Sequence, residues 1–172
     1  MKKNSLCRGV FVAAMLFVVP ALLPAASSAS PAVPSKEETS NLLQQLKSDA
    51  LTVKNEADGL RALTRDPFVT DWQDDGDQLI QIRSRVNDMS KLLAELRTNQ
   101  SADQPWQQKA IQSIAPAVVN LTDTTEAAVV SLNQNQGEVY QSNLYGLSQD
   151  LYNQADVITK TIRDVEKSAA QK

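Results

Sequence analysis

The sequence predicts an all-α fold, an up-down-up-down antiparallel four-helix bundle that follows an N-terminal signal peptide. Apolar residues recur at steps of three and four along four stretches of similar length, which is the spacing of one face of an α-helix. Short polar connections separate the stretches, and short connections make successive helices antiparallel neighbours. A longer helical hairpin array and an assembly of two-helix units are the alternatives. The predicted helices span about residues 36–64, 67–98, 105–134 and 138–170, each about 45 Å long.

Residues 1–29 have the basic, apolar, small-residue order of a secretory signal peptide. Lys2, Lys3 and Arg8 precede an apolar run over residues 10–23. This run is about 14 residues long and contains a proline, whereas a membrane-spanning helix needs roughly 20 residues. We therefore expect cleavage after Ala29, an exported protein in the periplasm or outside the cell, and no stable membrane span after cleavage. An uncleaved membrane anchor is the alternative.

The first predicted helix follows an extended spacer, residues 30–35, in which two prolines disfavour helix. Ser35 and Glu38 form a capping-box pair, in which each side chain can bond the backbone amide of the other. The apolar stripe of this helix then consists of Leu46, Ala50, Val53, Ala57 and Leu60.

The second predicted helix begins at Asp66-Pro67, which places an N-cap carboxylate before a proline in the first turn. Its stripe consists of Trp72, Gly76, Leu79, Ile82, Val86, Met89, Leu93 and Leu96. Eight successive matches to the helical period distinguish this segment from a strand or a loop.

The third and fourth predicted helices repeat these signals. Asp103 and Pro105 again pair an acidic cap with a proline, and Pro116 should kink the third helix because its ring removes a ladder hydrogen bond. The turn-forming composition of residues 133–137 separates the two helices. The third stripe runs through Trp106 or Ala110, Ile111, Ile114, Val118, Leu121, Thr125, Ala128 and Leu132, and the fourth through Tyr140, Leu144, Leu147, Leu151, Ala155, Ile158, Ile162, Val165 and Ala169.

The composition excludes several kinds of chemistry. The chain has no histidine, which removes the imidazole base, His-ligated metals and haem. Its one cysteine, Cys7, lies in the predicted signal peptide. Cleavage would remove three of the 17 basic residues and none of the 20 acidic ones, changing the net charge from −3 to −6, so a basic surface for nucleic acid is not expected. We expect no catalytic residues, no cofactor and no metal.

An acidic segment, residues 71–77, has a weak similarity to a calcium-binding loop. Asp71, Asp75 and Gly76 match positions one, five and six of an EF-hand, but position three is Gln73 and position twelve is Ile82, where a bidentate glutamate is needed. We interpret the segment as a solvated acidic first turn that complements the helix dipole.

Two candidate interaction surfaces emerge from the predicted topology. Phe68, Trp72, Tyr140 and Tyr145 should gather with several acidic residues at the end where the first and second helices connect. They would form either an aromatic plug that closes the core or a docking tip.

The other surface is the flank shared by the third and fourth helices. No basic residue occurs between Lys109 and Lys160, and charged residues are depleted at the centres of interfaces. Tyr145, Gln149 and Tyr152 are the candidate contact residues there, since tyrosine is favoured in interfaces. Alternatively, the tyrosines flank the core with solvated hydroxyls.

The sequence thus favours an exported, non-enzymatic helical bundle that interacts with a protein or an envelope component, or with itself. The alternative is a small-molecule carrier or sensor with a pocket between helices. In that alternative, small core residues would provide the space: Ala50, Ala57, Gly76, Ala128 and Ala155.

Overall fold

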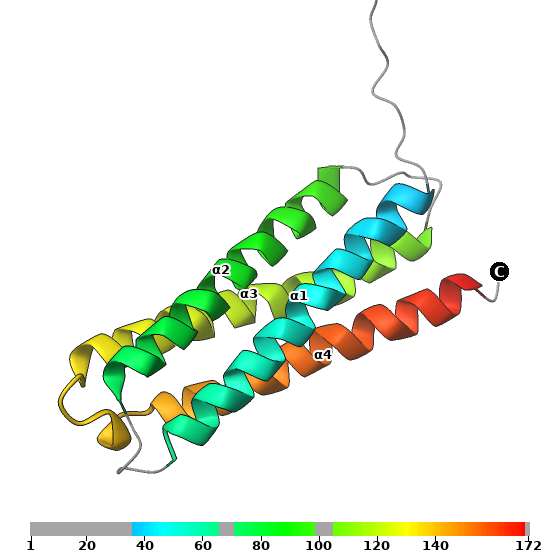
Figure 1. The fold of residues 1–172 in the computed structure, drawn as a ribbon. Coiled ribbons are helices and arrows are strands. Elements are labelled where there is room, and N and C mark those ends of the chain that lie inside the picture. Colours follow the sequence, from blue (N-terminus) through cyan, green and yellow to red (C-terminus); the bar gives the residue numbers. More distant parts are fainter. Residues whose placement is uncertain (1–35, 66–70, 99–104, 171–172) are drawn as a thin grey trace, which may run out of the picture. The chain divides into compact units, whose positions relative to one another are not determined.

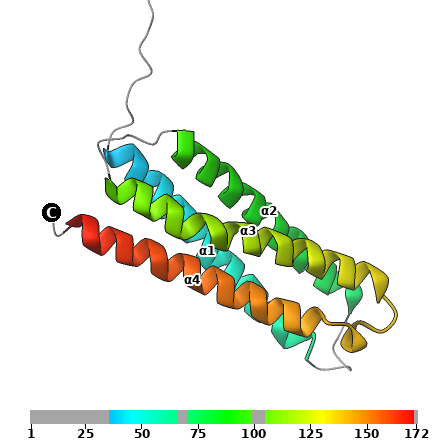
Figure 2. The ribbon, with the colours of Figure 1, turned by 180° about the vertical axis from the view of Figure 1, so that it is seen from behind.

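The computed structural model describes residues 36–65, 71–98 and 105–170, and it confirms the four-helix fold class. The helices are α1 (Lys36–Leu63), α2 (Trp72–Thr98), α3 (Pro105–Gln134) and α4 (Leu144–Ala170), and a short 3-10 helix, η1 (Val139–Gln141), precedes α4. Each helix packs against its neighbours in sequence, and α4 packs against α1 (Figures 1 and 2). The predicted signal peptide and spacer, Phe68, and the caps Asp66 and Asp103 lie outside the described residues.

The core consists of the apolar stripes that the helical period marks. Leu46 and Leu60 on α1, Ile82 on α2 and Leu121 on α3 are inaccessible to solvent, as is Ile158 on α4. Burying a side chain of this size stabilises a fold by about 1.5–3 kcal/mol relative to leaving it exposed. The spacing of apolar residues by three and four positions therefore identifies the helix faces that pack together in the core.

The second helix begins later than the predicted residue 67. Asp71 is not helical, and its carboxylate Oδ1 accepts a hydrogen bond of 2.9 Å from the Gln73 amide. Its carbonyl accepts one of 3.0 Å from the Asp75 amide, which is the first bond of the helical ladder. Asp71 is thus the N-cap of α2, because a carboxylate that bonds the exposed amides of the first turn fixes the helix start there.

The fourth helix also begins later than predicted. Residues 139–141 form η1, and the Ser142 hydroxyl accepts a 3.2 Å hydrogen bond from the Leu144 amide at the start of α4. Val139 is buried, whereas Tyr140 is 51% exposed. The assignment of Tyr140 to the apolar stripe is therefore wrong, because the 3-10 turn changes the helical phase before α4 begins.

Two features of α3 are an interior proline and a buried polar residue near its start. Pro116 lies within the helix on its exposed side, and α3 continues through it as a single element. Near the start of α3, the buried Gln107 amide donates a 3.3 Å hydrogen bond to the buried Thr39 hydroxyl of α1. Buried polar groups are costly unless they are hydrogen-bonded, so this bond satisfies two of them across the bundle.

Candidate functional site

The loop end is the end of the bundle where α1 and α3 finish and where α2 and α4 begin (Figure 1). The topology brings three of the predicted aromatic site residues there. Trp72, Tyr140 and Tyr145 are 41%, 51% and 44% exposed, respectively. The interpretation of these three rings as a buried plug is wrong, because Leu60, Leu79, Leu132, Val139 and Leu144 fill the core at this end.

An apolar groove lies beside Trp72, between the first turns of α2 and the last turns of α3. Its volume is about 280 Å³, and we refer to it as the Trp72 groove, lined by Trp72, Gly76, Leu79, Ile80, Arg83, Val129, Leu132 and Asn133. Ile80 is 67% exposed. At Gly76, an added Cβ would lie 3.6 Å from Leu132 Cδ2, so the absence of a side chain leaves the floor of the groove open.

Asp75 lies in the first turn of α2 and is buried. We expected this acidic segment to be solvated, so for Asp75 that interpretation is wrong. Its side chain is fully inaccessible, and within the described part of the chain both carboxylate oxygens lack a hydrogen-bond partner. Burial, reinforced by the nearby carboxylates of Asp74 and Asp71, raises the pKa of Asp75 to about 6. Asp74 and Asp77, by contrast, are exposed, as expected of a solvated helix start.

The weak calcium-loop similarity of this segment does not correspond to a loop, since the residues from Trp72 onward are helical. Asp71 is used as the helix cap. Among the described residues, no group of three or more acidic or cysteine side chains is arranged to hold a metal ion.

Tyr152 and Gln149 face α1, and this corrects the prediction that they lie on the flank between the third and fourth helices. The Tyr152 ring has Lys54 Nζ 4.9 Å and Arg61 Cζ 5.2 Å from its centroid. Gln149 Oε1 accepts a 2.7 Å hydrogen bond from Arg61. Both residues therefore belong to the contact between α1 and α4. There the Lys and Arg side chains lie over the tyrosine ring, and the Arg side chain also donates to the glutamine amide oxygen.

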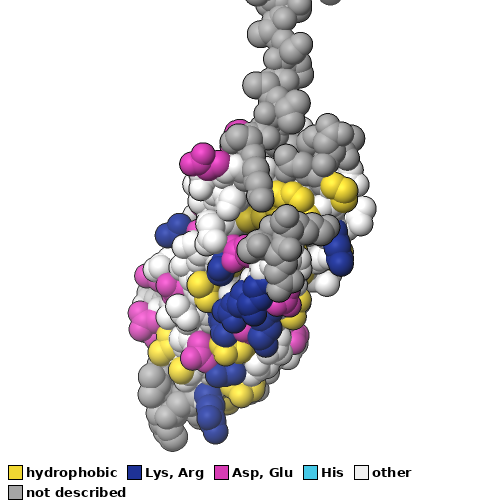
Figure 3. Space-filling view, turned by 90° about the vertical axis from the view of Figure 1, so that its right-hand side faces the viewer, with side chains coloured by type: hydrophobic (Ala, Val, Ile, Leu, Met, Phe, Trp, Pro, Cys, Tyr) yellow, Lys and Arg dark blue, Asp and Glu magenta, His cyan; other side chains and the backbone are white. Residues whose placement is uncertain are grey.

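Ion pairs extend this contact along the two helices. Lys54 Nζ lies 2.7 Å from Asp156 Oδ1, and Lys47 Nζ lies 2.9 Å from Glu166 Oε2. Hydrogen bonds from Lys160 and Lys54 lower the pKa of Asp156. Figure 3 shows Lys and Arg side chains grouped with Asp and Glu side chains beside them on one face. The charged side chains of this contact are thus paired with one another within the chain.

The flank between α3 and α4 carries the neutral side chains that the charge pattern predicted. Gln154 Nε2 donates a 2.9 Å hydrogen bond to Thr124 Oγ1 across it, and Val157 is exposed. Its role as an interface stays a prediction.

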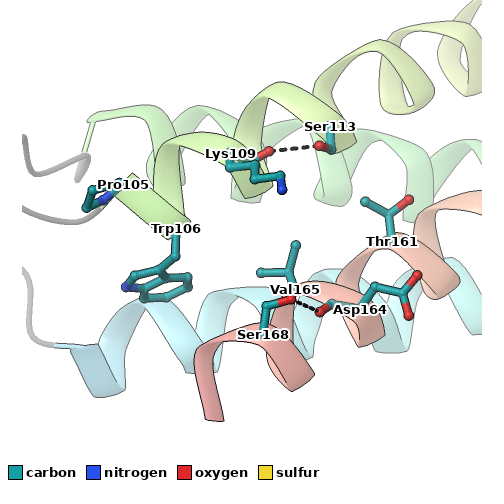
Figure 4. Close-up of a pocket in the computed structure, with 8 residues that line it drawn as sticks. All are labelled: Pro105, Trp106, Lys109, Ser113, Thr161, Asp164, Val165 and Ser168. Carbon is teal, nitrogen blue, oxygen red and sulfur yellow. Dashed lines mark hydrogen bonds between the residues drawn. The ribbon is translucent and has the colours of Figure 1, made fainter. Parts of the chain in front are cut away.

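A larger cleft lies at the opposite end of the bundle from the Trp72 groove, between the start of α3 and the end of α4 (Figure 4). Its volume is about 550 Å³, and we refer to it as the Trp106 cleft, lined by Pro105, Trp106, Lys109, Ser113, Thr161, Asp164, Val165 and Ser168. The sequence analysis separated Trp106 from the other aromatics but did not predict that it lies beside α4. A signal existed in the antiparallel order, which places the start of α3 beside the end of α4.

The four alanines proposed to open a pocket are instead fully packed. Ala50, Ala57, Ala128 and Ala155 are inaccessible to solvent, so they allow the helices to approach closely. Of the small residues named for that role, Gly76 does line a depression.

Comparison with known proteins found no matching family model, no matching curated protein and no matching solved structure. No helix in the described part of the chain combines the length and hydropathy that crossing a membrane requires.

Proposed function

We propose that this chain is an exported, non-enzymatic helical-bundle protein that binds a protein partner through the Trp72 groove. The observation that carries the proposal is the exposure of Trp72 and Ile80, two large apolar residues of α2 that line the same apolar depression. Large apolar side chains gathered in a groove favour a binding site, because isolated exposed apolar residues are common but contiguous patches are not. Export rests on the signal-peptide pattern of residues 1–29.

The groove favours a helical or extended partner segment that carries an apolar side chain. Gly76 provides room for such a side chain against Leu132 and Leu79, and tryptophan is enriched among the residues that dominate binding energies. Exposed carboxylates of Asp74 and Asp77 lie on the same turns of α2. A partner with basic residues beside its apolar anchor would therefore be complementary in charge.

Affinity capture from the native envelope tests this proposal. Ile80→Asp should reduce recovery of the partner at least tenfold, because a carboxylate would have to be desolvated in the groove. Val119→Asp, at an exposed valine of α3 that does not line the groove, is the matched control and should capture the partner as the parent does.

The capture experiment also separates the two candidate surfaces. Val157→Asp places the same charge on the flank between α3 and α4. If Val157→Asp abolishes capture and Ile80→Asp does not, the partner binds that flank and the groove proposal is wrong. Capture of a lipid or glycan component with no protein would identify an envelope ligand and would also contradict the proposal.

A further inference from the structure

We propose that the Trp106 cleft binds a small zwitterionic ligand, namely a short peptide with free termini and an apolar side chain. The cleft and the Trp72 groove lie at opposite ends of α3, so this inference does not rest on the proposed function. Its volume of about 550 Å³ is within the range of small-molecule sites, which is roughly 300–1,000 Å³.

The cleft has an apolar part formed by residues of both helices. Trp106 and Val165 are half-buried, and both pack against the hydrophobic core. In Figure 4 the Val165 side chain points from α4 into the space between the helices, and the Trp106 ring lies near the last turn of α4. An indole held by packing gives an apolar or aromatic ligand side chain a rigid surface at low entropic cost.

Two opposite charges line the cleft from different helices. Lys109 comes from α3 and Asp164 from α4, and both side chains are exposed. Within the described residues, neither side chain forms an ion pair. This differs from the contact between α1 and α4, where Lys54 and Asp156 lie 2.7 Å apart. An ammonium and a carboxylate left unpaired across a cleft are complementary to a ligand that carries both charges.

The hydroxyl groups of the cleft add neutral polar contacts. Ser113 Oγ donates to the Lys109 carbonyl at 2.8 Å, and Ser168 Oγ donates to the Asp164 carbonyl at 2.8 Å (Figure 4). Since each hydroxyl hydrogen is already used, the oxygens are left to accept hydrogen bonds. Peptide N–H groups are donors that can satisfy them, which favours a short peptide over a hydrocarbon.

The orientation of the ligand follows from these charges. The terminal carboxylate lies at Lys109, the terminal ammonium at Asp164, and the apolar side chain packs on Trp106. Each charge-assisted contact strengthens binding, but water competes with it because both protein groups are exposed.

Titration with the dipeptide Ala-Phe tests the proposal. The chain has two tryptophans, so a Trp72→Phe background leaves Trp106 as the only indole that reports binding by fluorescence. We expect a saturable change of Trp106 emission, confirmed by calorimetry with the parent chain. Lys109→Gln and Asp164→Asn should each weaken binding about tenfold, the order expected for loss of one charge-assisted contact.

Matched controls identify which feature of the ligand is recognised. Lys91→Gln on α2 and Asp123→Asn on α3 remove exposed charges outside the cleft and should bind as the parent does. Blocking the carboxyl terminus of the dipeptide should remove the effect of Lys109→Gln, and blocking its amino terminus should remove the effect of Asp164→Asn.

Three results would overturn the proposal. The first is the absence of a saturable signal up to a dipeptide concentration on the order of 10 mM, which corresponds to very weak binding. The second is equal binding of the dipeptide with both termini blocked. The third is that the cleft variants and the control variants change binding equally. Circular dichroism of each variant establishes that it is folded, so that lost binding reports on the cleft.

Discussion

Asp75→Asn should stabilise the bundle at neutral pH. The carboxylate of Asp75 is inaccessible to solvent and lacks a hydrogen-bond partner among the described residues, and its pKa is raised from 3.8 to about 6. The carboxyl group of Asp75 therefore binds a proton more tightly in the folded chain than in the unfolded chain. Asparagine has nearly the same shape and stays neutral, so it removes the cost of a buried charge.

The sign of the pH dependence follows from linkage. A raised carboxyl pKa means that the folded state is favoured when Asp75 is protonated, and stability is lost as the pH rises from about 4 to about 6. The rise of the Asp75 pKa from 3.8 to about 6 corresponds to about 3 kcal/mol as an upper limit. Asp75 lies in the first turn of α2, near solvent at the end of the bundle, so we expect about 1–2 kcal/mol.

Urea unfolding followed by circular dichroism at pH 4 and pH 7 measures this effect. The free energy of unfolding of Asp75→Asn should exceed that of the parent by about 1–2 kcal/mol at pH 7, and the difference should fall to about 0.5 kcal/mol at pH 4. Asp77→Asn, at an exposed neighbour, is the control and should show little difference at either pH. A pH-independent difference between Asp75→Asn and the parent would refute the argument.

Three further predictions concern the core, the contact between α1 and α4, and processing. Leu121→Ala should cost about 2–5 kcal/mol in urea melts because Leu121 is fully buried, whereas exposed Gln81→Ala should cost little, and equal effects would mean that the helical phase is wrong. Asp156→Asn should destabilise the bundle slightly in thermal melts, and the loss should shrink with added salt because ion pairs with Lys54 and Lys160 are screened. N-terminal mass analysis of the exported protein should find Ser30 first, and retention of residues 1–29 in a membrane fraction would favour the anchor.

The sequence by itself determined the four helices, because the alternation of three and four depends only on the geometry of a single helix. Stripe residues such as Leu46, Ile82 and Leu121 are buried as the pattern predicts. The exceptions lie at helix starts. Trp72 and Tyr140 fit the period but are exposed, because α2 begins only at Trp72 and Tyr140 lies in the 3-10 turn before α4.

Only the tertiary structure decided which flank of each helix meets which neighbour. Left-turning and right-turning bundles bury the same stripes but exchange the two flanks of every helix, so the helical period could not place Gln149 and Tyr152. In the fold they contact Arg61 of α1, while Thr161 and Asp164 on the other flank of α4 meet α3 and form the Trp106 cleft. The handedness of packing, which depends on contacts between residues far apart in the sequence, therefore determined the candidate sites.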